Sequence, residues 1–254
     1  MAGLKKETVH MAEYTLVWAD DFGLDGKPDP AKWTFETGGH GWGNGESQFY
    51  VDSQKNAFVQ GGSLFLKAFH ESHGENQYTS AKITTYGKAA WQYGKFEIRA
   101  KLPRGKGSWP AIWMMPVDSK QGVRWPLCGE IDIMEHVGWD ENKVHVSLHT
   151  DLYNHQNHTQ RTASEALEDV FHTFHVYGME WTDEKITFTF DGREIKTWTR
   201  GDNGTDSTAL GWPFDKPYYI ILNIAVGGFW GGEIDNNTLP YTMEVDYVHV
   251  YQKL

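Results

Sequence analysis

Short runs in which apolar and polar residues alternate recur along the chain of 254 residues and restrict the folds open to it. In residues 96–102, Phe96, Ile98 and Ala100 alternate with charged residues. Because neighbouring side chains of a β-strand point to opposite faces, this run predicts a strand with one buried face. Similar or continuously apolar runs predict strands at 47–51, 63–66, 79–85, 109–115, 130–135, 143–150, 173–181, 184–190, 193–198, 217–226 and 243–251.

The connections between these runs favour antiparallel sheets. Asp191-Gly192 joins two alternating runs with the residues that a tight hairpin prefers. Residues 218–226 are almost continuously apolar and predict a central strand covered on both faces. The one helical pattern, at 164–170, predicts about two turns. Many strands without helical crossovers predict an all-β protein, built as an antiparallel sandwich or barrel.

The sequence shows few signals of domain boundaries or of targeting segments. No repeat, linker or change of composition divides the chain, so we expect a single domain over 14–254. We expect residues 1–13 to be a flexible extension or tag, because they contain lysines but no apolar core of a secretory signal. The protein is then either secreted, with its signal absent from this chain, or cytoplasmic.

Composition excludes several classes of partner. The net charge of −11 argues against nucleic acid, because phosphate binding needs a basic face. No apolar run approaches the roughly 20 residues of a membrane span, so no membrane partner is expected. The single cysteine, Cys128, cannot form an intrachain disulfide.

The stretch 129–135 places Glu130, Asp132 and Glu135 among apolar residues. On a regular strand Glu130 and Asp132 share a face, whereas Glu135 would point with the isoleucines into the core. A buried, unpaired carboxylate is costly, so we predict a β-bulge at Ile133-Met134 that returns Glu135 to the face of the other acids. Three carboxylates on one surface can supply an acid, a base and a nucleophile.

Three tryptophans stand where they can line a cleft beside these acids. Trp109 and Trp113 share one face of a predicted strand, roughly 13 Å apart, with the small Ala111 between them. Trp125 precedes the acidic stretch, next to Pro126. Flat indole rings can stack on the C–H faces of sugars, although the strand spacing of the first pair also fits burial in a core.

Two other segments can border the carboxylates. In the predicted strand 143–150, His145, Ser147 and His149 share one face, which points toward either the acids or solvent. The Gly-rich loop 38–46 contains Asn44, which suits recognition of a hydroxyl, and lacks the lysine and helix of a phosphate-binding loop. Cys128 shares the face of Glu130, but a small buried hydrophobe is the usual role of a free cysteine, rather than a Cys–His nucleophile.

Taken together, these residues resemble glycoside hydrolase family 16, specifically its laminarinase-like endo-1,3-β-glucanases. The most specific match is the acidic motif, whose extra residue Met134 is typical of laminarinase-like and agarase-like members and is absent from mixed-linkage lichenases. Nearly the whole chain matches, through residues 18–22, 41–46, 79–85, 93–97, 109–113, 125–135, 222–228 and 245–252.

The resemblance implies a β-jelly-roll sandwich whose concave sheet carries an open cleft, and retaining hydrolysis of a β-glucan. Glu130 is then the nucleophile, Glu135 the general acid/base and Asp132 a carboxylate that tunes both. No cofactor is implied for catalysis. The implied substrate-binding residues are the donor-side Trp109, Trp113 and Trp125, a hydroxyl-binding Asn44, and His149 near the leaving group.

The resemblance also implies a structural calcium ion on the convex face, bound by Asp21, the backbone oxygen of Gly62 and Asp246. Oxygen ligands suit this ion. The chain departs from the family in three places: Asp21 often corresponds to a glutamate, Lys82 to an arginine, and residues 230–233 to Trp-Pro-Gly.

The leading prediction is a monomeric endo-hydrolase of β-1,3-glucan. A related enzyme acting on mixed-linkage β-1,3-1,4-glucan, agar or another galactan is an alternative, although the loop 42–46 favours glucan. A non-catalytic glycan-binding module is a further alternative, against which the presence of all three acids argues.

Overall fold

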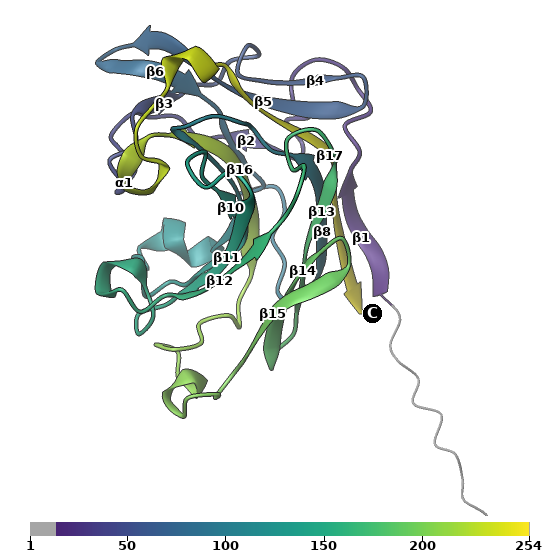
Figure 1. The fold of residues 1–254 in the computed structure, drawn as a ribbon. Helices are drawn as coiled ribbons and strands as arrows, with labels where there is room; N and C mark the ends of the chain where they lie inside the picture. Colours follow the sequence, from purple (N-terminus) through teal and green to yellow (C-terminus); the bar gives the residue numbers. More distant parts are fainter. Residues whose placement is uncertain (1–13, 254) are drawn as a thin grey trace, which may run out of the picture.

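The computed structural model describes residues 14–253 and consists of two β-sheets packed face to face (Figure 1). The extension predicted at 1–13 lies outside the described residues. Within the described part, no helix combines the length and apolar character that a membrane span requires.

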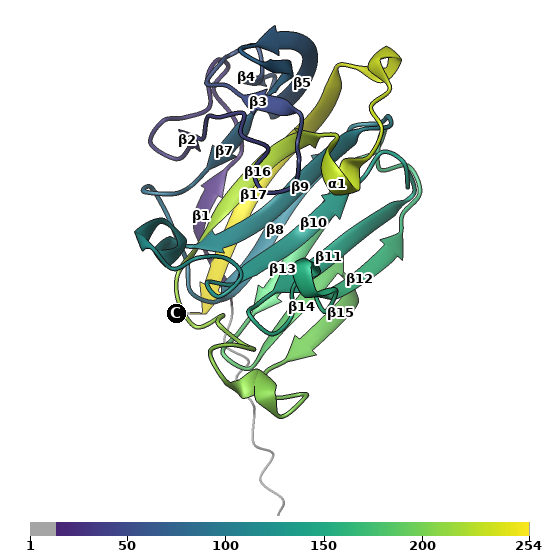
Figure 2. The same cartoon turned by 90° about the vertical axis from the view of Figure 1, so that its left-hand side faces the viewer.

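The concave sheet faces the viewer in Figure 2 and is antiparallel throughout. Its strands, in spatial order, are β12 (Arg161–Ala166), β11 (Lys143–His149), β10 (Glu130–His136), β9 (Ser108–Pro116), β16 (Tyr218–Val226), β7 (Lys82–Thr84) and β2 (Thr34–Phe35).

The convex sheet covers the other side, with β1 (Tyr14–Asp20) and β4 (Ala57–Gln60) added beside its main path. The main path runs through β15 (Arg193–Thr199), β14 (Lys185–Phe190), β13 (His175–Trp181), β8 (Gly94–Lys101), β17 (Tyr241–Lys253), β5 (Ser63–His73), β6 (Asn76–Ser80) and β3 (Gln48–Tyr50). The pairing is antiparallel except between β3 and β6. The predicted antiparallel jelly-roll sandwich is confirmed.

Alternate side chains of both sheets meet in one hydrophobic cluster. All nine residues of β16 are buried, as predicted for a central strand. The predicted hairpin joins β14 and β15, with Asp191 at φ 49° and Gly192 at φ 76°. Positive φ at both positions is the geometry that a two-residue hairpin turn requires.

The helix predicted at 164–170 is wrong. Residues up to Ala166 belong to β12, which pairs with β11 from Lys143↔Ala166 to Leu148↔Arg161. The chain then turns, with Asp169 at φ 65°. Hydrogen bonds to the edge of the concave sheet therefore outweigh the weak local preference for helix.

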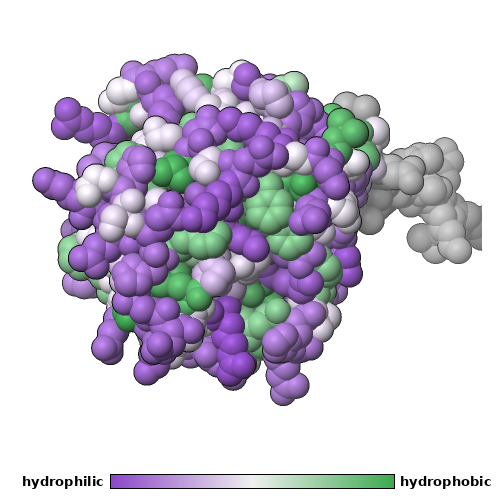
Figure 3. Space-filling view, turned by 90° about the horizontal axis from the view of Figure 1, so that it is seen from above, coloured by the Kyte–Doolittle hydropathy of each residue, from purple (hydrophilic) through white to green (hydrophobic). Residues whose placement is uncertain are grey.

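Short helices lie in the connections: α1 (Gly228–Gly231), η1 (Val117–Gln121), η2 (His155–Asn157), η3 (Thr205–Ser207) and η4 (Asn236–Thr238). In Figure 1, α1 and η2 stand out on the hollow side of the concave sheet. Seen from above, the surface is mostly hydrophilic, with apolar side chains in small separate patches (Figure 3).

Replacing Gly138 with alanine is expected to destabilise the junction between β10 and the turn before β9. A Cβ atom at Gly138 would collide with the carbonyl oxygen of Gly105, which is backbone and cannot turn aside. We expect a loss of about 2 kcal/mol or more in the free energy of unfolding, measured by urea denaturation. Gly23→Ala is the matched control, because open space surrounds that glycine. Equal stability of both variants would contradict the steric argument.

Candidate active site

A bulge in β10 brings the three acids of the 129–135 stretch to one face. Against β11, Asp132 pairs with Ser147 and Glu135 with His145, so three steps along β10 match two along β11. Against β9, Met134 pairs with Ile112. Ile131, Ile133 and Met134 are fully buried, whereas Glu135 is only partly buried. The predicted bulge at Ile133-Met134 is confirmed.

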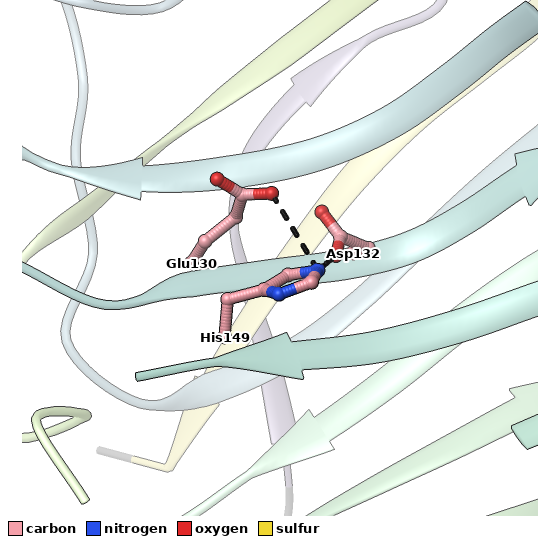
Figure 4. Close-up of side chains that lie close together, drawn as sticks. All are labelled: Glu130, Asp132 and His149. Atoms are coloured by element: carbon pink, nitrogen blue, oxygen red, sulfur yellow. Dashed lines mark ion pairs between the residues drawn. The ribbon is translucent and has the colours of Figure 1, made fainter. Parts of the chain in front are cut away.

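Two of the carboxylates, Glu130 and Asp132, form a compact cluster with His149 on β11 (Figure 4). The imidazole Nε2 of His149 lies 3.3 Å from Oδ2 of Asp132 and 4.0 Å from Oε1 of Glu130. His149 therefore lies beside Glu130 and Asp132, whereas His145 is the register partner of Glu135.

Burial in this cluster makes ionisation unfavourable. Desolvation, followed by the charge of Asp132, raises the pKa of Glu130 to about 8. Desolvation raises the pKa of Glu135 to about 7, although a hydrogen bond from Trp109 opposes the shift. Burial and the charge of Glu135 raise the pKa of Asp132 well above its usual range. The cluster therefore retains protons near neutral pH, as acid/base chemistry needs.

The predicted tryptophans line the cleft instead of entering the core. Trp109 and Trp113 are partly exposed on β9. Ile112, which lies between them, and Met114, which follows Trp113, are fully buried. The indole Nε1 of Trp109 donates to Oε1 of Glu135 at 3.0 Å. Trp125 is also partly exposed, and its ring stacks on His155 of η2 with 4.7 Å between centroids.

A chain of hydrogen bonds ties Asn44 to the cleft floor. The amide of Asn44 donates to Glu46 at 3.1 Å, and the hydroxyl of Tyr50 donates to the same carboxylate at 3.3 Å. Asn223 on β16 donates to Tyr50 at 3.0 Å and accepts from Nε1 of Trp113 at 2.7 Å. The network fixes both the Gly-rich loop and the indole plane of Trp113.

A buried lysine forms the end of this wall. Lys82 lies 2.9 Å from Glu36 and places its ammonium 4.2 Å from the ring centre of Trp42 and 4.9 Å from that of Trp113. Lys120 reaches the same carboxylate of Glu36 at 2.6 Å. Burial alone would raise the pKa of Glu36, but the two lysines together lower it. Side chains including Trp42, Lys82, Trp113 and Trp125 line an open pocket of about 250 Å³.

Sequence reasoning missed several of these residues. Asn223 interrupts the apolar run of residues 218–226, and a polar residue in such a run could have been predicted to take part in the site. Glu36 and Lys120 are remote from the motifs, and only folding brings them to Lys82. Trp230, whose ring lies 5.4 Å from Trp109, follows the Gly-Gly pair 227–228 that ends β16.

Cys128 is fully buried, and desolvation raises the pKa of its thiol to about 12. A thiolate is the nucleophilic form of cysteine, so this environment disfavours the Cys–His alternative.

Among residues 14–253, one group of three metal-ligating side chains comes together: Glu130, Asp132 and His149, with donor atoms within 4.8 Å of one another. These carboxylates are the ones that acid/base chemistry requires. On the convex side, Asp21 lies 2.7 Å from the imidazole of His249, and Asp246 lies 2.5 Å from the guanidinium of Arg99. Because each carboxylate is paired with a basic side chain, this arrangement does not favour a calcium ion between them. Calcium binding stays a prediction.

Clustered carboxyl groups on the floor of a tryptophan-lined cleft, carried by a jelly-roll sandwich, define the class of glycoside hydrolases. The sequence profile of glycosyl hydrolases family 16 matches residues 44–249, and the chain belongs to this family.

Relatives of known name agree with this class. The chain is 48% identical over 245 residues to a beta-glucanase of Rhodothermus marinus, covering 94% of this chain and 85% of the relative. The crystal structure of the laminarinase from Rhodothermus marinus superposes with a TM-score of 0.93 at 46% identity, covering 96% of this chain and 99% of that one. A keratan-sulfate endo-1,4-beta-galactosidase of Sphingobacterium multivorum is 35% identical, covering 98% of this chain and 58% of the relative.

Glu135→Gln is expected to stabilise the protein in a pH-dependent way. The pKa of Glu135 rises from 4.5 in the unfolded chain to about 7 in the folded one, so wild-type stability falls as the pH rises between these values. Glutamine avoids this loss and can still accept from Trp109. We expect the variant to be more stable than wild type by about 1–3 kcal/mol at pH 8, and nearly equal at pH 4.

Denaturant unfolding at both pH values measures this difference. Glu168→Gln changes an exposed carboxylate and serves as the control. A gain at pH 4 as large as that at pH 8 would contradict the ionisation argument.

Proposed function

We propose that the protein is a retaining endo-hydrolase of β-1,3-glucan of the laminarin type. The observation that carries the proposal is the bulge at Ile133-Met134, which sets Glu130 and Glu135 on one face of β10 in a cleft lined by tryptophans. Two carboxyl groups on one face can flank a glycosidic bond that lies across the strand.

In the first step, the carboxylate of Glu130 attacks the anomeric carbon while Glu135 protonates the departing glycosidic oxygen. The leaving sugar departs, and a glycosyl ester forms on Glu130. In the second step, Glu135 removes a proton from water, which attacks the same carbon and releases Glu130. Two inversions at one carbon return the β-configuration.

The division of roles follows the resemblance of the acidic motif to that of the family, because burial raises the pKa of both carboxyls, to about 8 for Glu130 and about 7 for Glu135. His149, with Nε2 4.0 Å from Glu130, lowers the pKa of that carboxyl against the larger effects of burial and of Asp132, which raise it. Burial keeps Glu135 protonated up to a pH of about 7, as a general acid requires. Asp132 lies beside His149 and holds the imidazole close to Glu130.

The donor part of the glucan fits the wall formed by Trp113, Trp125 and the network around Asn44. Indole faces stack on sugar rings, and fixed amides select hydroxyl positions. Mixed-linkage glucan is the second candidate substrate, because the pocket is open and does not enclose the sugar chain. We also propose that the enzyme is secreted and acts as a monomer, since a polysaccharide chain is met outside the cell.

Glu130→Gln should abolish hydrolysis of laminarin while leaving its binding intact. The amide is nearly isosteric with the carboxylate but is not a nucleophile, so we expect the rate of reducing-end release to fall by about 10³-fold or more. Calorimetric titration with laminarin oligosaccharides measures the retained binding. Full activity of this variant would reject Glu130 as nucleophile, and binding without hydrolysis by wild type would point to a glycan-binding module.

Product analysis tests the stereochemistry and the substrate separately. Proton NMR at early times should show β-anomers before mutarotation, whereas initial α-anomers would contradict the double displacement. Sizing the products from laminarin, lichenan and agarose should show the fastest release of short oligosaccharides from laminarin. Faster cleavage of lichenan or agarose would show that this polysaccharide, and not β-1,3-glucan, is the preferred substrate.

A further inference from the structure

Glu130, Asp132 and His149 turn three metal-binding groups toward one another on the floor of the cleft (Figure 4). Glu130 and Asp132 are two residues apart on β10, and His149 is the register partner of Glu130 on β11. The imidazole Nε2 lies 3.3 Å from Oδ2 of Asp132 and 4.0 Å from Oε1 of Glu130. Regular pairing of two strands therefore brings one nitrogen and two carboxylates together.

The buried carboxylate of this group has an unsatisfied oxygen. Asp132 is 2% exposed, and its Oδ2 accepts no hydrogen bond from the described residues, although Nε2 of His149 is close. A buried carboxylate oxygen without a donor is costly, and such groups commonly have a partner in native proteins. A cation bound between Asp132 and its neighbours would supply the missing partner.

The spacing fits a transition-metal ion with one nitrogen and two oxygen ligands. Zinc binds imidazole nitrogen and carboxylate oxygen at roughly 2.0–2.2 Å, so two ligands of one ion lie at most about 4.4 Å apart. Both distances from His149 satisfy this limit, and Glu130, which is only partly buried, can turn its longer side chain toward the ion.

The composition of the group selects the kind of ion. Three protein ligands beside an open cleft leave the fourth position of a tetrahedral zinc site to water. A neutral imidazole suits zinc and copper, whereas calcium requires about six to eight oxygen ligands, which these three side chains do not provide.

We propose that Glu130, Asp132 and His149 form a binding site for Zn²⁺ and related transition-metal ions, and that the bound ion inhibits the enzyme reversibly. Binding rests on the arrangement of the three side chains alone. Inhibition rests on the proposed function as well, because a metal bond to Glu130 occupies the carboxylate that attacks the anomeric carbon. Cu²⁺ binds nitrogen and oxygen ligands more tightly than Zn²⁺, so it should inhibit at lower concentration.

Calorimetric titration with Zn²⁺, and the visible absorption of added Co²⁺, test the site in the whole protein. Wild type and Glu135→Gln keep all three ligands and should bind alike. His149→Gln and Asp132→Asn each remove a ligand, and we expect Kd to rise about 10-fold or more, since even the loss of a group that only orients a ligand has this effect. His172→Gln, which removes an exposed histidine, is the matched control and should keep the wild-type affinity.

The rate of laminarin cleavage gives a second measurement. Zn²⁺ should raise the apparent KM of wild type and of His172→Gln to the same extent, because the ion occupies the floor on which the sugar binds. Addition of EDTA should restore the original rate. Ca²⁺ at the same concentration should leave the rate unchanged.

The outcomes separate the metal site from the proposed reaction. Absence of Zn²⁺ binding by wild type, or wild-type affinity in both His149→Gln and Asp132→Asn, would overturn the site. Binding at the site with no loss of activity would overturn the inhibition. A wild-type protein that binds Zn²⁺ but does not cleave laminarin in EDTA would overturn the proposed reaction and leave the metal site standing. A cooperative thermal transition in EDTA checks that each variant is folded.

Discussion

One extra residue in β10 decides where the carboxylate of Glu135 points, and the active site depends on that direction. With regular alternation, Glu135 would enter the core beside Ile131 and Ile133. The bulge instead buries Ile133 and Met134 in succession, so that two apolar neighbours are accommodated on the core side. The local break in pairing with β9 and β11 is stabilised by the regular ladders on both sides of it.

The desolvated carboxylates of β10 are unfavourable for stability, and the rest of the concave sheet limits this effect. His149 lies beside two of them, and Trp109 donates to the third. Strand β16, which pairs with β9 next to β10, is buried along its whole length, which keeps the floor of the cleft rigid. A rigid floor holds the acids close enough to share protons, because moving apart would require the central strands to shift.

Local patterns predicted most of the fold and the central acids. Alternation located the strands, and the misfit of Glu135 predicted the bulge without knowledge of any neighbouring strand. The hairpin at Asp191-Gly192 was likewise a local signal. The error at 164–170 arose because pairing with β11 is a long-range interaction that a seven-residue window does not contain. For the same reason, the meeting of Glu36, Lys82 and Lys120 followed only from the assembled sheet.

The cleft combines two kinds of surface, and the difference between them bears on specificity. Asn44, Glu46 and Asn223 form a hydrogen-bonded network whose geometry is fixed by Tyr50 and Trp113. A site built from buried polar groups discriminates strongly, because a ligand that mismatches them leaves them unpaired. The partly exposed faces of Trp113 and Trp125 bind by stacking, which tolerates changes in hydroxyl position. A cleft built in this way selects hydroxyl positions at the network and accepts more varied sugars along its aromatic wall, because only the network leaves polar groups unpaired when the sugar is wrong.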